Sequence, residues 1–157
     1  MKFKSAAKYH RMMRAHKELL RIATSTGNAI SLSEAREATE EFFSHCYHFK
    51  DWLLKEQPNL KNAVEDHISK SNALSLAADI CNSYKHAGLD RTPRSGHPLD
   101  DVLQHTKIDL TPQGFVASAH VEVKTGGKSY KAGDLATECI HDWDAFLQSV
   151  NITIPAP

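Results

Sequence analysis

The stretch "SLSEAREATEEFFSHCYHFKDWLLKEQP", residues 31–58, decides the fold of this chain. Its apolar residues recur at steps of three, four or seven, the spacing of one face of an α-helix. These residues are Ala35, Phe42, Cys46, Phe49 and Leu53. Ser31 and Glu34 have the spacing of a capping box, and Pro58 cannot continue a helix. We therefore predict a helix over residues 32–56 whose apolar face lies in one core with Ile80 and Trp143.

The segments on either side of this helix favour further helices. Residues 3–23 contain no Pro or Gly and are mostly strong helix formers. "NLKNAVEDHISK" (59–70) and "SNALSLAADICNSYKHAGL" (71–89) predict a third and a fourth helix, and residues 134–150 predict the last. Between them, "DRTPRSGHPLDD" (90–101) is rich in Pro, Gly and charge, which predicts an exposed, protease-sensitive loop.

The hydrophobic period changes in "GFVASAHVEVK", residues 114–124. Apolar and polar residues alternate there, as in a strand packed on one side only. "TKIDL" before it and "KSYKA" after it predict partner strands of a small meander at about residues 104–131. The prediction is a single domain over residues 1–157. It is mainly α, an antiparallel four- to five-helix bundle with a small antiparallel β-meander before the last helix.

Composition excludes several broad classes of protein. Nineteen Lys and Arg balance nineteen Asp and Glu, so any binding to nucleic acid or anionic lipid needs a local patch. Residues 2–21 carry seven Lys or Arg and a single Glu18, so this helix could contact RNA or a membrane, or it could present an ordinary solvated face. The three Cys residues form no C-x-x-C pair, which argues against a disulfide scaffold or zinc ribbon. No apolar run is long enough for a membrane span, so we expect no membrane association and a cytoplasmic location.

A polar stripe in "DICNSYKH", residues 79–86, is the first candidate site. At about 100° per residue, Asp79, Asn82 and His86 fall on one face of the predicted fourth helix. His86 can act as an acid or base near neutral pH, and Asp79 can orient it. Asn82 can hold a phosphate or an amide, and Lys85 can contact a phosphate. The alternative is that Asp79 and Asn82 bridge helices and that His86 only terminates its helix.

A second polar set lies in "SHCYHFKDW", residues 44–52. His48 and Asp51 could face the stripe across a groove between the second and fourth helices and contribute to substrate binding. His45 and His48, completed by Asp79 or His86, could instead hold a metal ion. No recognised metal motif such as H-E-x-x-H is present, and no motif requires a cofactor. A ligand- or metal-binding bundle, or a structural or interaction protein, therefore remains an alternative.

The stretch that ends in His86 resembles the HEPN superfamily of helical nucleotide-associated domains. Members carry an Arg and a His near a helix end, often with a polar residue directly after the Arg. Asn82 and His86 match an R-N-x-x-x-H pattern, and Cys81 occupies the position of the Arg. The resemblance implies an RNA-acting or RNA-binding protein of the kind found in toxin–antitoxin or phage-defence systems. Nuclease activity is doubtful because the Arg is missing, and whether the protein is an enzyme stays open.

The same resemblance implies how the chain assembles. In HEPN proteins the Arg and the His come together across a dimer and cleave RNA without a metal. We therefore expect a homodimer, with His86 at or near its interface, and RNA as the partner.

Overall fold

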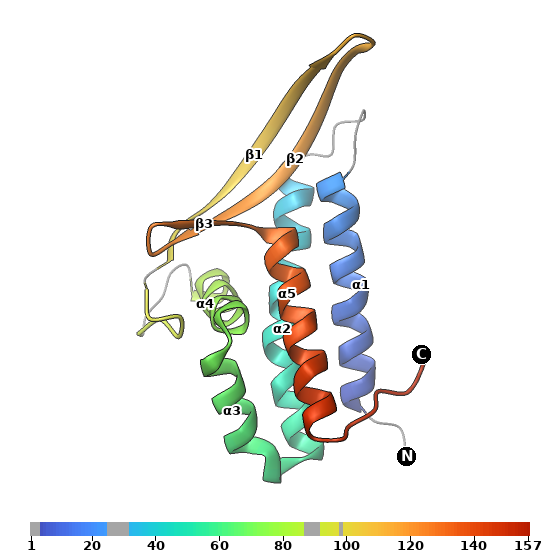
Figure 1. The fold of residues 1–157 in the computed structure, drawn as a ribbon, viewed down its shortest axis with the longest axis vertical. Helices are drawn as coiled ribbons and strands as arrows, with labels where there is room; N and C mark the ends of the chain where they lie inside the picture. Colours follow the sequence, from blue (N-terminus) through green and yellow to red (C-terminus); the bar gives the residue numbers. More distant parts are fainter. Residues whose placement is uncertain (1–3, 25–31, 87–91, 98) are drawn as a thin grey trace.

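The computed structural model confirms the predicted fold class. It describes residues 4–24, 32–86, 92–97 and 99–157, and only the backbone at residues 24, 32, 85, 86, 99–111 and 115–120. Five α-helices, one short 3-10 helix and three strands follow one another along the chain (Figure 1). Their order is α1 (Lys4–Thr24), α2 (Leu32–Glu56), η1 (Pro58–Leu60), α3 (Lys61–Lys70), α4 (Asn72–His86), β1 (Leu99–Thr111), β2 (Gly114–Thr125), β3 (Lys128–Lys131) and α5 (Ala132–Ser149).

The helices form one bundle. Helices α1, α2 and α5 run side by side along its length, and α3 and α4 cover the side away from α1 (Figure 1). Helix α4 packs against both α2 and α5, so the predicted neighbourhood of the second and fourth helices is confirmed. In this arrangement α4 has one flank towards α2 and another towards α3.

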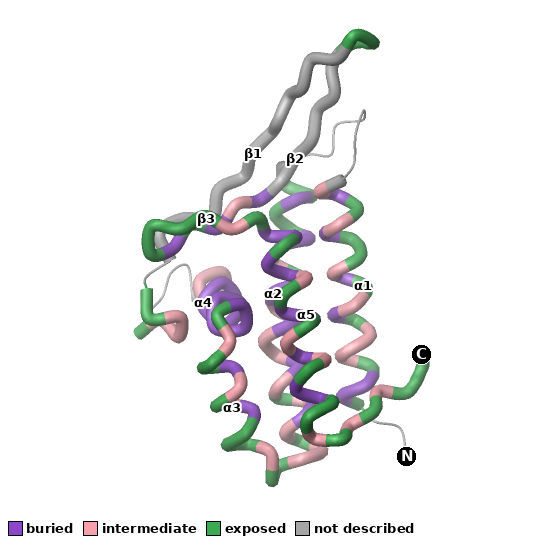
Figure 2. The backbone as a smooth tube through the Cα atoms, in the orientation of Figure 1, coloured by how far each residue is buried: buried purple, intermediate pink, exposed green. Residues whose placement is uncertain are grey.

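The core is built on the apolar face of α2. Phe42, Cys46, Phe49 and Leu53 are all buried, and so are Ile80 on α4 and Trp143 on α5, as predicted. Buried segments line the inner faces of the helices (Figure 2). The indole N–H of Trp143 donates to the carbonyl oxygen of Cys46 at 3.2 Å, so the largest core side chain is also hydrogen-bonded.

The β-strands form a longer element than the sequence predicts. β1 and β2 pair in antiparallel register from Leu99–Thr125 to Thr111–Gly114, and their hairpin extends well beyond the bundle (Figure 1). We call this hairpin the arm. The predicted start of the meander at residue 104 is wrong, because β2 is long enough to pair with β1 back to Leu99. Alternation in the second strand was visible in the sequence, whereas the extent of its partner depends on the register.

The third strand anchors the arm to the bundle. β3 pairs only with residues 122–125 of β2, and α5 begins directly after it. Gly126 and Gly127 make the connecting turn with φ of 55° and 74°, a left-handed conformation that favours glycine. A Cβ at Gly126 would also lie 2.9 Å from the ring of His97, so the turn lies against the preceding loop.

Among the described residues, no helix has the length and apolar character that a membrane crossing requires.

Candidate functional site

Asp79 is the most deeply buried member of the predicted stripe. Its side chain accepts three hydrogen bonds from the loop that follows α4. The backbone N–H of Arg94 donates to Oδ1 at 2.7 Å, and the backbone N–H and hydroxyl of Ser95 donate to Oδ2 at 3.0 and 2.5 Å. Asp79 is only 1% exposed. A buried carboxylate needs such partners, so this residue fixes the loop in place.

Arg94 holds the same loop through its side chain. Its Nη2 donates to the carbonyl oxygen of Glu65 at 3.0 Å, to Glu65 Oε2 at 2.5 Å and to the hydroxyl of Ser69 at 3.3 Å. The side chain of Arg94 is 22% exposed. The prediction of a uniformly exposed loop is therefore wrong for residues 93–95, which are half-buried, because charged hydrogen bonds dock them on α3 and α4. Residues 90, 91 and 98 of the predicted loop lie outside the described part.

A cavity of about 420 Å³ lies between this loop and helices α2, α3 and α4. This volume is within the range of about 300–1,000 Å³ that is typical of small-molecule sites. We call it the Asn82 cavity, and it is lined by Tyr47, Glu65, Asp66, Ser69, Asp79, Asn82, Thr92 and Arg94. Within the described part of the chain, the Asn82 amide has no hydrogen-bond partner. Its donor and acceptor are therefore open to a ligand.

The Asn82 cavity carries more negative than positive charge. Glu65, Asp66 and Asp79 line it, and Arg94 is its only lining cation among the described residues. Lys50 lies 3.5 Å from Glu65 Oε1. Burial alone would raise the pKa of Glu65, but the hydrogen bond and charge of Arg94, helped by Lys50, outweigh it and hold that pKa below its ordinary value. Glu65 is therefore ionised at neutral pH, and the described lining of the cavity carries a net negative charge.

The sequence predicts that His48 faces the stripe, but the structure places His48 elsewhere. Its Nδ1 lies 2.9 Å from the carbonyl oxygen of Ser44 and 3.9 Å from Cys81 Sγ. His48 and Cys81 line a different cavity of about 440 Å³ on the α2 flank of α4, with Tyr84 and three glutamates of α2. The predicted single groove is thus two cavities, because α4 turns Cys81 towards α2 and turns Asp79 and Asn82 towards α3 and the loop.

Asp51 does not join the stripe either. Its Oδ1 accepts a hydrogen bond from the neighbouring Lys50 at 3.1 Å, and its side chain is 48% exposed. Asp51 is not among the residues that line the Asn82 cavity with Asp79. Residue 51 lies on a solvent-exposed part of α2, whereas the core stripe of that helix is on its inner side.

The remaining candidates are placed as follows. The side chains of Lys85 and His86 lie outside the described part, and their backbone forms the last turn of α4. His45 lies 3.6 Å from Glu41, and burial lowers its pKa although that glutamate opposes the change. No group of three or more His, Cys, Asp or Glu that could hold a metal ion is found among the described residues.

Six of the eight lining residues of the Asn82 cavity escaped sequence-based reasoning: Tyr47, Glu65, Asp66, Ser69, Thr92 and Arg94. Arg94 stands in a segment whose composition is typical of exposed loops. The sequence contained a partial signal, because the carboxyl group of Asp79 requires hydrogen-bond donors once its face of the helix is buried. The sequence does not say which segment supplies that donor.

Comparison of the chain with family models, with curated proteins and with solved structures returns no match.

Proposed function

We propose that this protein binds RNA, as its HEPN-like motif implies, and that the Asn82 cavity receives an unpaired base. The observation that carries the proposal is the Asn82 amide, which lies on the motif helix and has no described partner. An amide presents a donor and an acceptor side by side, the arrangement that reads a base edge. Sequence-specific RNA recognition commonly uses bases that are unstacked and hydrogen-bonded in this way.

Charge supports a base rather than a phosphate as the group in the cavity. In the described lining, Glu65, Asp66 and Asp79 outnumber the single cation, Arg94, which is already engaged by Glu65. A phosphate there would meet net repulsion. A base is uncharged, and exocyclic amino groups such as those of adenine and cytosine can donate to these carboxylates.

Binding fits the geometry better than cleavage does. The position of the motif's Arg is occupied by Cys81, which is 5% exposed and lies on the other flank of α4. Asp79 is occupied by three hydrogen bonds to the loop, so it is committed to structure rather than to orienting a histidine. Cleavage that depends on His86 is therefore not part of the proposal, and an RNA-cleavage assay on wild type and His86→Ala examines it separately.

The test compares two asparagines on helices of the same bundle. Asn82→Ala removes the cavity amide, and Asn62→Ala removes an exposed amide of α3 as a matched control. With fluorescein-labelled single-stranded RNA of mixed sequence, we expect Asn82→Ala to weaken binding about five- to tenfold, the value of one or two hydrogen bonds. Asn62→Ala should bind as the wild type does. Equal affinities of the two variants would contradict the base-binding role of the cavity.

A second candidate function is that of an interaction protein, and the arm favours it. The sheet order β1-β2-β3 leaves β1 at an edge, and β2 beyond residues 122–125 has no second described partner. Edge strands offer unpaired backbone groups to another chain, and a two-stranded hairpin alone is only marginally stable. In this second candidate function, the partner that pairs with the arm is a second copy of this chain, in a homodimer.

Light scattering should give a dimer mass for wild type and a monomer mass when residues 107–118 are replaced by Asn-Gly. An unchanged mass would exclude the arm as the interface.

A further inference from the structure

Helix α1 presents a row of cations on its outer face. Steps of three or four residues connect Lys4, Lys8, Arg11, Arg14, Lys17 and Arg21. At about 100° per residue, all of them except Lys8 fall within about 140° of the helix circumference, on one side of the helix. From Lys4 to Arg21 the row is about 25 Å long at a rise of about 1.5 Å per residue. The apolar side of α1 is already used, because Met12, Ala15, Leu19 and Ile22 are buried in the core.

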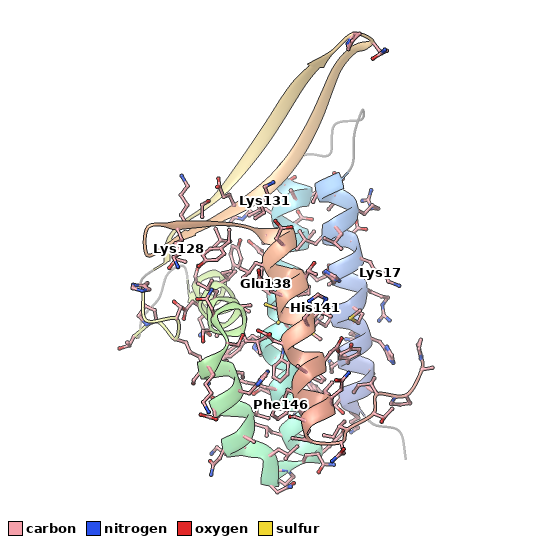
Figure 3. All side chains as sticks on the ribbon, in the orientation of Figure 1. Lys17, Lys128, Lys131, Glu138, His141 and Phe146 are labelled. Atoms are coloured by element: carbon pink, nitrogen blue, oxygen red, sulfur yellow. The ribbon has the colours of Figure 1, made fainter. Side chains whose placement is uncertain are left out.

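The middle of this row is exposed and available. Arg11, Arg14 and Lys17 are exposed, and none has an acidic ion-pair partner among the described residues. Lys17 extends outward from the bundle (Figure 3). Two of the other cations are engaged within the protein: Arg21 pairs with Glu18 at 2.7 Å, and the Lys8 ammonium lies 4.3 Å from the ring centre of Trp52.

Carboxylates from the neighbouring helix do not cancel the row. A concave surface between α1 and α2 is lined by Arg11, Arg14, Ala15, Glu18, Glu41 and His45. Of its two carboxylates, Glu18 is paired with Arg21, whereas Glu41 lies 3.6 Å from His45, whose lowered pKa leaves the imidazole neutral at neutral pH. Arg11 and Arg14 outnumber Glu41, so this surface keeps a net positive charge in a protein whose formal net charge is zero. A local field of this kind attracts polyanions.

We infer that the outer face of α1, which we call the cationic face, binds the phosphodiester backbone of a nucleic acid. A lipid surface fits it less well, because a helix that lies in a membrane interface needs large apolar side chains beside its cations. The exposed residues of α1 are Lys4, Ala7, Arg11, Arg14, Lys17, Glu18 and Arg21, and none of them is a large apolar residue. Phosphate contacts of this kind give affinity and little sequence preference.

The cationic face and the Asn82 cavity are separate sites. Helices α1 and α4 lie on opposite sides of α5 in the bundle (Figure 1). The inference that α1 binds a phosphodiester backbone stands by itself. Only the choice of RNA as the nucleic acid rests on the proposed function. Substitutions on α1 should leave the cavity intact, so the two proposals can fail independently.

The test removes three charges from the cationic face and, in the control, three charges from exposed positions elsewhere. The first variant is Arg11→Gln/Arg14→Gln/Lys17→Gln, and the control is Lys61→Gln/Lys124→Gln/Lys128→Gln, all exposed positions outside both sites. Affinity for labelled single-stranded RNA is measured by fluorescence anisotropy at several salt concentrations. The wild type and the control should show the same slope of log affinity against log salt. Because each phosphate contact on a single strand contributes about −0.7, the α1 variant should lose about two units of that slope.

Two parallel titrations identify the ligand. Duplex DNA and vesicles containing phosphatidylserine are titrated with the same proteins. A shallower slope for the α1 variant on RNA or on DNA supports the inference and names the nucleic acid. Equal slopes for the α1 variant and the control, loss of vesicle binding alone, or no nucleic-acid binding by wild type would each overturn it. Loss of binding by Asn82→Ala with an unchanged slope for the α1 variant would overturn this inference and leave the proposed function standing. A melting temperature equal to that of wild type confirms that the variants are folded.

Discussion

The two ends of the polar stripe on α4 differ in what their side chains do. Towards its start, Ser75 donates to the carbonyl oxygen of Ile68 at 2.8 Å, and Asp79 accepts three hydrogen bonds from the loop. Both residues are buried and satisfied. Asn82, one turn further on, is only half-buried and opens into a cavity without a described partner. Polar residues on one helix face can thus be structural at one end and available for binding at the other.

The largest expected effect concerns Asp79. Asp79→Ala removes the acceptor of three hydrogen bonds and leaves the donors of Arg94 and Ser95 without a partner, so we expect a loss of about 3 kcal/mol in the free energy of unfolding. Urea denaturation followed by circular dichroism measures it. Trypsin should also cut after Arg94 sooner in the variant than in wild type, because the loop is released. A loss below about 0.5 kcal/mol, typical of surface substitutions, would contradict the anchoring role.

Ser75→Ala should have a smaller effect of the same kind. It removes one buried hydroxyl that donates to Ile68, and we expect a loss of about 1 kcal/mol by urea denaturation. The orphaned carbonyl oxygen is the physical cause. Ser83→Ala, on the half-buried surface of the same helix, is the matched control and should stay close to wild type. Equal losses in the two variants would mean that helix propensity, not the buried hydrogen bond, sets the effect.

The ion pair that docks the loop should make stability depend on pH. The pKa of Glu65 is below its ordinary value of 4.5 when the protein is folded, so the unfolded chain takes up the proton first as the pH falls. The stabilisation from Arg94 is therefore complete above about pH 4.5 and is lost as the pH falls through the folded pKa. Thermal melts of wild type and Arg94→Gln at several pH values should differ most at neutral pH, and the difference should narrow in acid. A constant difference across this range would show that Arg94 acts through packing and its hydrogen bonds to the Glu65 carbonyl oxygen and Ser69, and not through the ion pair.

Asn82→Ala should have the smallest effect on stability. Because its amide makes no hydrogen bond within the described part of the chain, we expect a change of less than about 0.5 kcal/mol. The variant should nevertheless lose RNA affinity, which separates a binding residue from a structural one. A destabilisation comparable to that of Asp79→Ala would remove the contrast between the two ends of the stripe.

The apolar period of α2 predicted its residues 32–56, its buried face and its partners Ile80 and Trp143, and all of these are confirmed. Alternation in residues 114–124 similarly predicted β2. These features depend on local chain geometry and on the removal of apolar surface from water, which a sequence records as periodicity. Likewise, the three-residue step from Asp79 to Asn82 placed both side chains on one cavity, as the structure confirms.

Tertiary structure alone decided which groups meet these faces. A helical period gives the angle between side chains on one helix but not the orientation of that helix against its neighbours. The rotation of α4 in the bundle set His48 beside Cys81 and separated it from Asp79. The path of the loop brought Arg94 to Glu65 and Asp79, and the strand register carried β1 back to Leu99. Contacts between residues distant in sequence arise from how the elements pack together, and no local pattern encodes them.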